Sequence, residues 1–222
     1  MGKTKNGDDA HDGGGTAPPT GLSAEGLDAA TRAASGVASG AASGVASGIG
    51  RRGPAPVHLW NPPHCGAIDM RIARDGTWFH EGAPIGRPGM VRLFASILRR
   101  DPEGFVLVTP VEKVSIVVDD APFVAVDVER SDPGGVLTFR TNLDDEVTAG
   151  SSHPIRVARD PSTGEPSPYV LVRGGLEARI DRKTFYRLVD LGEVAPHGGA
   201  DWFGVRSGAA FFPIIPAADL PD

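Results

Sequence analysis

Short runs rich in Val, Ile and Leu, separated by turn residues, dominate the chain from residue 69 onward. Runs of this length bounded by Gly, Pro, Asn or Asp are typical of β-strands. In the first half of this region they predict strands at 69–73, 77–80, 105–109, 111–118 and 123–128. In the second half they predict strands at 155–159, 169–173, 176–180, 202–206 and 209–214.

Two other segments space their apolar residues as one face of a helix does. The first begins at Pro88, a residue suited to the first turn, and is expected to end at 99–102. Its apolar positions are Met90, Leu93, Phe94, Ile97 and Leu98. The second helix is predicted at 182–191, with Asp181 as its N-cap and Gly192 as its stop.

The chain repeats itself. Residues 70–75 recur almost unchanged at 155–160, and 85–93 are matched by 180–188. The second pair of blocks is further apart than the first, and a Pro- and Ser-rich insertion at 161–168 accounts for the difference. We therefore predict an α+β fold of two duplicated units, each an antiparallel sheet with one helix, at 57–132 and 133–222.

Residues 1–56 show no apolar periodicity and are rich in Gly, Ser and Ala. Such a tail buries too little surface to offset its ordering entropy, so we predict that it is disordered. Its glycines recur at the spacing of a membrane-helix packing face, but large apolar residues are too few to span a bilayer. The polar start, 1–12, is followed by no apolar stretch, so we expect no signal peptide.

Charge and cysteine content narrow the class of protein. The net charge is -6, and because the acidic and basic residues of the tail balance, it belongs to the predicted folded part. An acidic core argues against nucleic acid as a partner. With one cysteine, Cys65, no intramolecular disulfide can form, and the chain is expected to be cytoplasmic.

No arrangement of residues selects a catalytic or metal site. His64, Cys65 and Asp69 do not match a zinc spacing, and the acidic run 144–146 lacks the glycine of a calcium loop. Several serines and histidines could be combined into a nucleophilic set, but their spacing favours none of them. We therefore expect no cofactor and lean towards a protein that is not an enzyme.

Arg87 and Arg182 hold matching positions in the two repeats, each at the start of a predicted helix. Free backbone amides at a helix start favour anions, and an arginine adds a bidentate donor for phosphate or carboxylate. The alternative is that each arginine pairs with an acid such as Glu112 or Glu177 to hold its helix on the sheet. Both roles can hold together.

Several collinear motifs resemble a bacterial family, domain of unknown function 1285. The matching segments are 61–69, Trp78 with 84–87, 109–114, 141–147, 153–154 and 176–182. The resemblance implies a duplicated α+β core whose C-terminal half is like pleckstrin-homology folds. It also implies a ligand site between the domains, nucleotide-like in character, and a role in signal transduction, without an established activity.

These observations lead to one hypothesis and two alternatives. We expect a non-enzymatic module that binds a small anionic, nucleotide-like ligand between its repeats and passes this signal to a protein partner. The expected ligand-binding residues are Arg87, Glu112, Lys113, Asn142, Asp144, Arg173, Glu177 and Arg182. The alternatives are a protein-interaction scaffold and a hydrolase of a phosphorylated small molecule.

Overall fold

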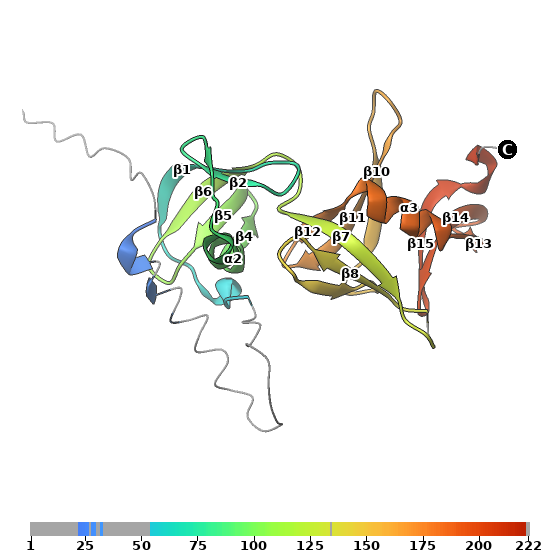
Figure 1. The fold of residues 1–222 in the computed structure, drawn as a ribbon, viewed down its shortest axis with the longest axis horizontal. Helices are drawn as coiled ribbons and strands as arrows, with labels where there is room; N and C mark the ends of the chain where they lie inside the picture. The colour runs from blue at the N-terminus through green and yellow to red at the C-terminus, as the bar shows by residue number, and fades with distance from the viewer. Residues whose placement is uncertain (1–21, 27, 30–31, 33–53, 134, 221–222) are drawn as a thin grey trace, which may run out of the picture.

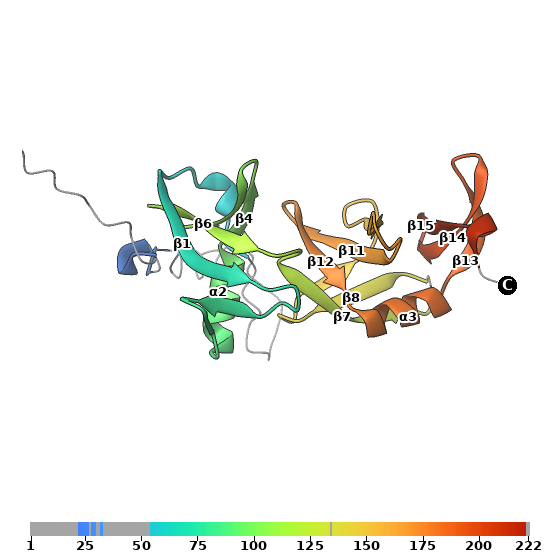
Figure 2. The same ribbon diagram turned by 90° about the horizontal axis from the view of Figure 1, so that it is seen from above.

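The fold consists of two sheet-dominated domains followed by a small third sheet (Figures 1 and 2). It is seen in a computed structural model that describes residues 22–26, 28–29, 32, 54–133 and 135–220. The two large sheets give the architecture a repeat-like character. The described helices are few and short, so the fold is only loosely α+β.

The first domain is a six-stranded sheet covered on one face by helix α2 (Pro88–Ser96). Trp78, fully buried, stacks on Phe94 of this helix with ring centroids 6.2 Å apart. A short 3-10 turn, η2 (Val57–Leu59), precedes the first strand. The strands in spatial order are β3 (Ala83–Pro84), β2 (Trp78–His80), β1 (His64–Ile72), β6 (Lys113–Val118), β5 (Gly104–Val108) and β4 (Leu98–Asp101).

The second domain has another six-stranded sheet, followed by helix α3 (Arg182–Asp190) and a three-stranded sheet at the end of the molecule (Figure 1). Its strands in spatial order are β10 (Ile155–Arg159), β11 (Pro166–Arg173), β12 (Leu176–Ile180), β7 (Phe123–Arg130), β8 (Leu137–Thr141) and β9 (Glu146–Thr148). The third sheet contains β13 (Glu193–His197), β14 (Ala200–Ser207) and β15 (Ala210–Pro216), with η3 (Ala217–Asp219) after it.

Both large sheets have the same topology. In each, three strands form a meander, three more form a second meander, and the first and last strands pair in parallel at the centre. Strand β1 therefore corresponds to β7, and β6 corresponds to β12.

This correspondence differs from the one read in the sequence. The repeated segments 70–75 and 155–160 lie in β1 and β10, which hold different places in the two sheets. Helix α2 lies between the third and fourth strands of its sheet, whereas α3 follows the sixth. The two helices are thus not equivalent. The structural repeat pairs strands β1–β6 with β7–β12, which is a different correspondence from that of the similar sequence segments, because sheet topology can recur without similar residues.

The domains meet earlier in the chain than the sequence predicted. Strand β7 belongs to the second sheet, so the change of sheet falls at 119–122 and not near residue 132. Strand β7 was expected to close the first unit because it follows β6 after a short turn. Its hydrogen-bonded partners, β8 and β12, show that it begins the second sheet.

Most predicted elements are present, but the first helix is shorter than predicted. It ends at Ser96, and Leu98 begins strand β4 by pairing with Leu107. Apolar spacing could not distinguish the end of the helix from the start of the strand, because Leu98 is a buried position in both structures. The prediction at the second helix is confirmed, since the Asp181 carboxylate accepts the Thr184 N–H at 2.7 Å.

Besides β4, four strands were missed. Two of them, β3 and β9, are very short, and β13 contains Pro196 and is largely exposed, so none of these carries a clear apolar signal. Strand β8 does alternate buried and exposed residues, but it was not recognised.

The expected tail, 1–56, lies mostly outside the described residues. Its described part departs from the prediction of disorder, because residues 24–26 are helical and Ser23 hydrogen bonds to Glu112 of the first domain. The helices in the described parts of the chain are all too short or too polar to cross a membrane.

Candidate functional site

The candidate site is the junction where the first and second sheets meet. The connection at 119–122 is short, so the turns of one domain touch strands of the other. On the side of the first domain, the junction contains the β1–β2 turn, the C-terminal end of α2 and strand β4. The second domain contributes the β8–β9 turn and the β11–β12 hairpin.

A carboxylate in the connecting segment organises one face of this junction. Asp120 accepts a 2.7 Å hydrogen bond from the Tyr169 hydroxyl, and its other oxygen lies 3.3 Å from Arg74 Nε and 3.6 Å from Arg179 Nε. The Asp120 side chain is 17% exposed. Burial, followed by the bond to Asp120, raises the pKa of Tyr169, so the phenol stays protonated and keeps donating.

Next to Tyr169, on the same face, lies an ion pair between Arg156 and Glu177. The guanidinium of Arg156 lies over the Tyr169 ring, 4.2 Å from its centroid, and binds both carboxylate oxygens of Glu177. The hydrogen bond to Glu177 raises the pKa of Arg156, and burial opposes this. Glu177 is therefore committed to a structural pair, which with Asp120, Tyr169 and Arg179 forms what we call the Asp120 cluster.

A second group of residues, the Arg173 cluster, lies on the opposite face of the second sheet. Arg173 donates to the carbonyl of Ala95 at 2.9 Å, near the end of α2, and to Asp145 at 3.1 Å. Its guanidinium also lies over the buried ring of Phe123, 4.8 Å from the centroid. Phe123 pairs with Ala178, so both side chains lie on one face of the sheet. Arg179 follows Ala178 in the strand and points to the other face, because successive strand residues alternate between faces.

Arg100 of strand β4 completes this side of the junction. Its stem packs against the glycine pair that turns β11 into β12: a Cβ built on Gly175 would lie 3.8 Å from Arg100 Cβ. The guanidinium lies over the Phe105 ring at 4.4 Å, and no described residue forms an ion pair with it. Arg100 is exposed, so its guanidinium is available to a ligand.

The β8–β9 turn is fixed by Asn142. Its side-chain oxygen accepts the Val124 N–H at 3.0 Å, and its backbone N–H donates to the Val124 carbonyl at 2.8 Å. Gly76 of the β1–β2 turn packs directly on the Asn142 amide, where a Cβ would overlap it. Asn142 therefore sets how closely the two domains approach.

The predicted site residues separate into groups. Asn142 and Arg173 lie together at the junction, and Asp144 is in the same turn as Asn142, 4.0 Å from Arg140. Glu177 lies on the opposite face of the second sheet. The remaining four lie elsewhere and belong to other contacts: Arg87, Glu112, Lys113 and Arg182.

The two helix-start arginines do not meet. Arg87 is the exposed N-cap residue of α2, and its side chain has no hydrogen-bond or ion-pair partner among the described residues. Arg182 donates to the Tyr186 hydroxyl at 3.0 Å, and that bond raises the pKa of its guanidinium. The suggested pairings with Glu112 and Glu177 are absent from the described residues, because those acids bind Ser23 and Arg156.

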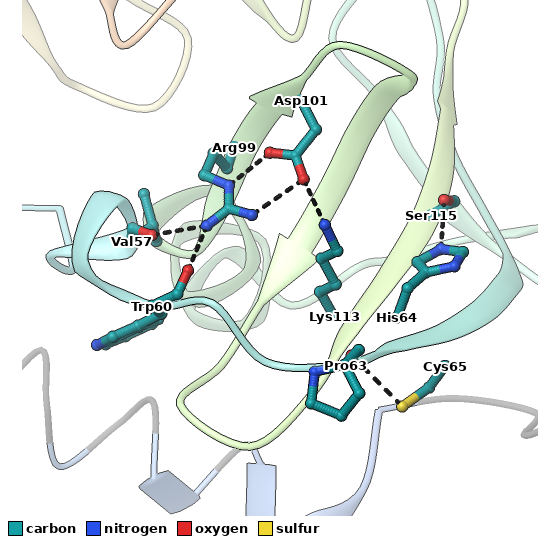
Figure 3. A network of polar contacts seen from close by, with 9 residues as sticks. All are labelled: Val57, Trp60, Pro63, His64, Cys65, Arg99, Asp101, Lys113 and Ser115. Atoms are coloured by element: carbon teal, nitrogen blue, oxygen red, sulfur yellow. Dashed lines mark hydrogen bonds and ion pairs between the residues drawn. The ribbon is translucent and has the colours of Figure 1, made fainter.

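Lys113 belongs to a polar network inside the first domain (Figure 3). Its ammonium donates to Asp101 at 2.8 Å, and Arg99 binds the same carboxylate at 2.6 and 2.9 Å. Arg99 also donates to the carbonyls of Val57 and Trp60 at 2.9 and 2.6 Å, which fixes the segment before β1. The hydrogen bond from Arg99 lowers the pKa of Asp101 to about 2.

Beside this network, His64 Nε2 and Ser115 Oγ lie 2.9 Å apart (Figure 3). The free thiol of Cys65 points to the carbonyl of Pro63 at 3.7 Å. Nothing in the described part of the chain gathers three metal-ligating side chains of the His, Cys, Asp and Glu types.

An open cavity of about 460 Å³ lies in the second domain, away from the junction. It is lined by Val128, Glu129, Arg130, Arg187, Asp190 and Leu191. Arg187 and Arg140 bind the nearby Asp127 carboxylate and lower its pKa against the opposing effect of burial.

Sequence reasoning missed the residues that hold the junction together, mainly Asp120, Tyr169, Arg179 and Arg100. Asp120 was interpreted only as a turn residue between strands. The one available signal was the place of Asp120 in the sequence, because a short segment that connects two domains must lie where the domains meet. Arg100 was assigned to the end of a helix, which hid its place on an edge strand.

Comparison with known proteins agrees with this architecture. Residues 55–121 match the family model "Domain of unknown function (DUF1285), N-terminal domain", and residues 122–214 match "Protein of unknown function (DUF1285), C-terminal domain". The chain therefore belongs to the DUF1285 family. The family boundary falls in the connection between β6 and β7, where the sheets change.

Two solved structures of this family are similar to the chain. A DUF1285 protein from Silicibacter pomeroyi is 59% identical, with a TM-score of 0.71, and the match covers 79% of this chain and 98% of that one. Another from Shewanella baltica is 29% identical, with a TM-score of 0.45, over 55% of this chain and 91% of that one. No curated protein matches the sequence significantly.

Proposed function

We propose that the protein is a non-enzymatic module that binds a small anionic ligand on the Arg173 side of the domain junction. One observation carries the proposal: four arginines lie at the junction, and two aspartates, Asp120 and Asp145, form ion pairs with only three of them, in a chain of net charge -6. The arginines are Arg74, Arg100, Arg173 and Arg179.

Within this set, Arg100 and Arg173 are the expected anion-binding pair. Arg100 has a guanidinium without an acidic partner among described residues, and both guanidinium groups lie over aromatic rings, those of Phe105 and Phe123. A stacked guanidinium loses less conformational freedom when it binds, and its fork suits phosphate or carboxylate oxygens. Asn142 is a neighbouring polar group for the ligand's uncharged part.

The opposite face of the junction has a different role in this proposal. The Asp120 cluster joins the connecting segment to the second domain through the hydrogen bond from Tyr169 and the ion pair with Arg179, and Arg74 of the first domain pairs with the same carboxylate, so we expect it to hold the domains at a fixed separation. A ligand that bridges Arg100 of the first domain and Arg173 of the second would tighten the same junction from the other face. Ligand binding would thereby change how firmly the two domains are joined. We propose that this change is the signal that the protein passes on.

Thermal unfolding of the full chain with inorganic phosphate, pyrophosphate and nucleoside phosphates tests the proposal. A ligand at about 100 times its dissociation constant stabilises the folded protein by about 2.7 kcal/mol. Arg100→Ala should abolish the shift, and because the Arg100 guanidinium contacts only the Phe105 ring, its loss should change the unliganded stability by about 1 kcal/mol at most. Arg92→Ala removes an exposed arginine of α2 and should leave the shift intact.

The outcome also separates this site from one built on the two helix-start arginines. Arg87→Ala and Arg182→Ala should leave the ligand-induced shift unchanged, because neither residue reaches the junction. If those variants lose the shift and Arg100→Ala keeps it, the junction site is wrong. Turnover of a phosphorylated compound by the purified protein would favour a hydrolase instead.

A second candidate function, a protein-interaction scaffold, is favoured by the third sheet. His197, Trp202 and Phe211 form an aromatic cluster there, with His197 5.9 Å from the Phe211 ring and 6.4 Å from the Trp202 ring. Aromatic side chains of this kind are enriched at interfaces. Trp202→Ala should weaken capture of a partner without altering phosphate-dependent stabilisation. The likeness of the C-terminal half to pleckstrin-homology folds stays a prediction.

A further inference from the structure

The N-terminal segment, which we define as residues 22–26, makes directed contacts with the first domain. The backbone N–H and the hydroxyl of Ser23 both donate to Glu112 Oε1, at 2.8 and 2.6 Å. Ser23 Oγ in turn accepts the Gly26 N–H at 3.0 Å. Leu22 packs against the hydrophobic core. The segment is therefore held by both polar and apolar contacts.

The surface that receives it is a rigid turn, 109–112, between β5 and β6. Thr109 is fully buried, and its hydroxyl accepts the N–H groups of Val111 and Glu112 at 3.3 and 3.1 Å. Its own N–H donates to the Glu112 carbonyl at 2.9 Å. These bonds fix the backbone of Glu112, so its carboxylate projects from a preformed surface.

The fit at Gly26 is selective. Gly26 is buried, and a Cβ at this position would overlap Glu112 Oε1 and lie 3.1 Å from Thr109 Oγ1. The carboxylate cannot move aside without losing both hydrogen bonds from Ser23. The surface thus selects a glycine three residues after the serine.

We propose that the 109–112 turn is a peptide-docking site and that the chain's own 22–26 segment is its intramolecular occupant. Recognition requires an apolar residue, a serine and, three residues after the serine, a glycine. Figure 1 shows the segment, in blue, on the side of the first domain away from the second domain. The site is therefore separate from the proposed ligand site at the junction.

Hydrogen–deuterium exchange in the full chain tests docking directly, because the Ser23 and Gly26 amides are both hydrogen-bonded in the docked state. The Ser23 N–H binds a charged carboxylate, and such a hydrogen bond contributes about 1.5–3 kcal/mol, so its loss should speed exchange of the Ser23 amide at least about tenfold. Glu112→Ala and Gly26→Ala should each produce this increase. Glu103→Ala, which removes an exposed carboxylate elsewhere on the same domain, should not.

A second experiment tests recognition in trans. A fluorescent peptide of residues 16–34 should bind to full-length Gly26→Ala protein, whose own segment is released. It should fail to bind when Glu112→Ala is added to that protein. Equal exchange of the Ser23 amide in all variants would overturn the proposal. So would a peptide that does not bind Gly26→Ala protein, or that binds the double variant equally well.

Discussion

The carboxylate of Asp101 should make the first domain sensitive to acid. This side chain is buried between Arg99 and Lys113, and it is the only group that neutralises either cation among the described contacts. Asp101→Asn keeps the shape of the side chain but removes its charge. The substitution leaves two partly buried cations facing an amide, which is unfavourable in a region of low polarity.

The size of the effect follows from the pKa. Arg99 lowers the pKa of Asp101 from the ordinary 3.8 to about 2. Each unit corresponds to about 1.4 kcal/mol, so the charged form contributes about 2 kcal/mol at most to the free energy of unfolding. A carboxyl whose folded pKa is lowered contributes above its unfolded pKa and loses the contribution as the pH falls towards the folded value.

Urea unfolding of the wild type and of Asp101→Asn over a range of pH provides the measurement. The wild type should be more stable by about 2 kcal/mol at about pH 7, and the difference should shrink by about 1 kcal/mol by about pH 3. Asp201→Asn removes an exposed aspartate and should follow the wild-type profile. A stability difference that stays constant across this pH range would refute the role assigned to Asp101.

Three further predictions concern single contacts. Tyr169→Phe removes the hydrogen bond to Asp120 and should lower the free energy of unfolding by about 1–3 kcal/mol, because a buried carboxylate loses its donor; chemical denaturation measures it, and ultraviolet titration should show that wild-type Tyr169 ionises later than a free tyrosine. Gly204→Ala would drive a methyl group into a backbone carbonyl of the neighbouring strand, so it should cost about 1–3 kcal/mol, whereas Gly150→Ala, which meets open space, should unfold like the wild type. Asp181→Ala removes the N-cap of α3 and should cost about 1 kcal/mol, seen as a lower thermal midpoint; an unchanged midpoint would contradict the capping role.

Local patterns predicted the elements of the fold better than their arrangement. The alternation from Leu176 to Ile180 and the capping residue Asp181 are local signals, and both predictions agree with the structure. The order of strands in a sheet depends on contacts between distant residues, which no local pattern encodes. The similar segments 70–75 and 155–160 were therefore taken as equivalent although they occupy different strand positions.

The candidate site was harder to predict for a related reason. Arg173 and Asn142 were recognised as polar residues near a domain contact, but their partners Ala95 and Val124 offer only backbone atoms. A backbone partner leaves no trace in residue type. Glu112 was expected to bind a ligand, and its carboxylate instead receives a segment that composition alone had assigned to a disordered tail.

The parallel pairing of the first and last strands has a consequence for how the protein is made. In each large sheet the central pair joins strands from the two ends of the domain, so neither sheet can close until its sixth strand has been synthesised. Such distant pairings slow folding. The first sheet is complete once Val118 is available, before any strand of the second has been translated. Emergence from the ribosome thus separates two similar sheets in time, and strands of one have little opportunity to pair with the other while it is unfinished.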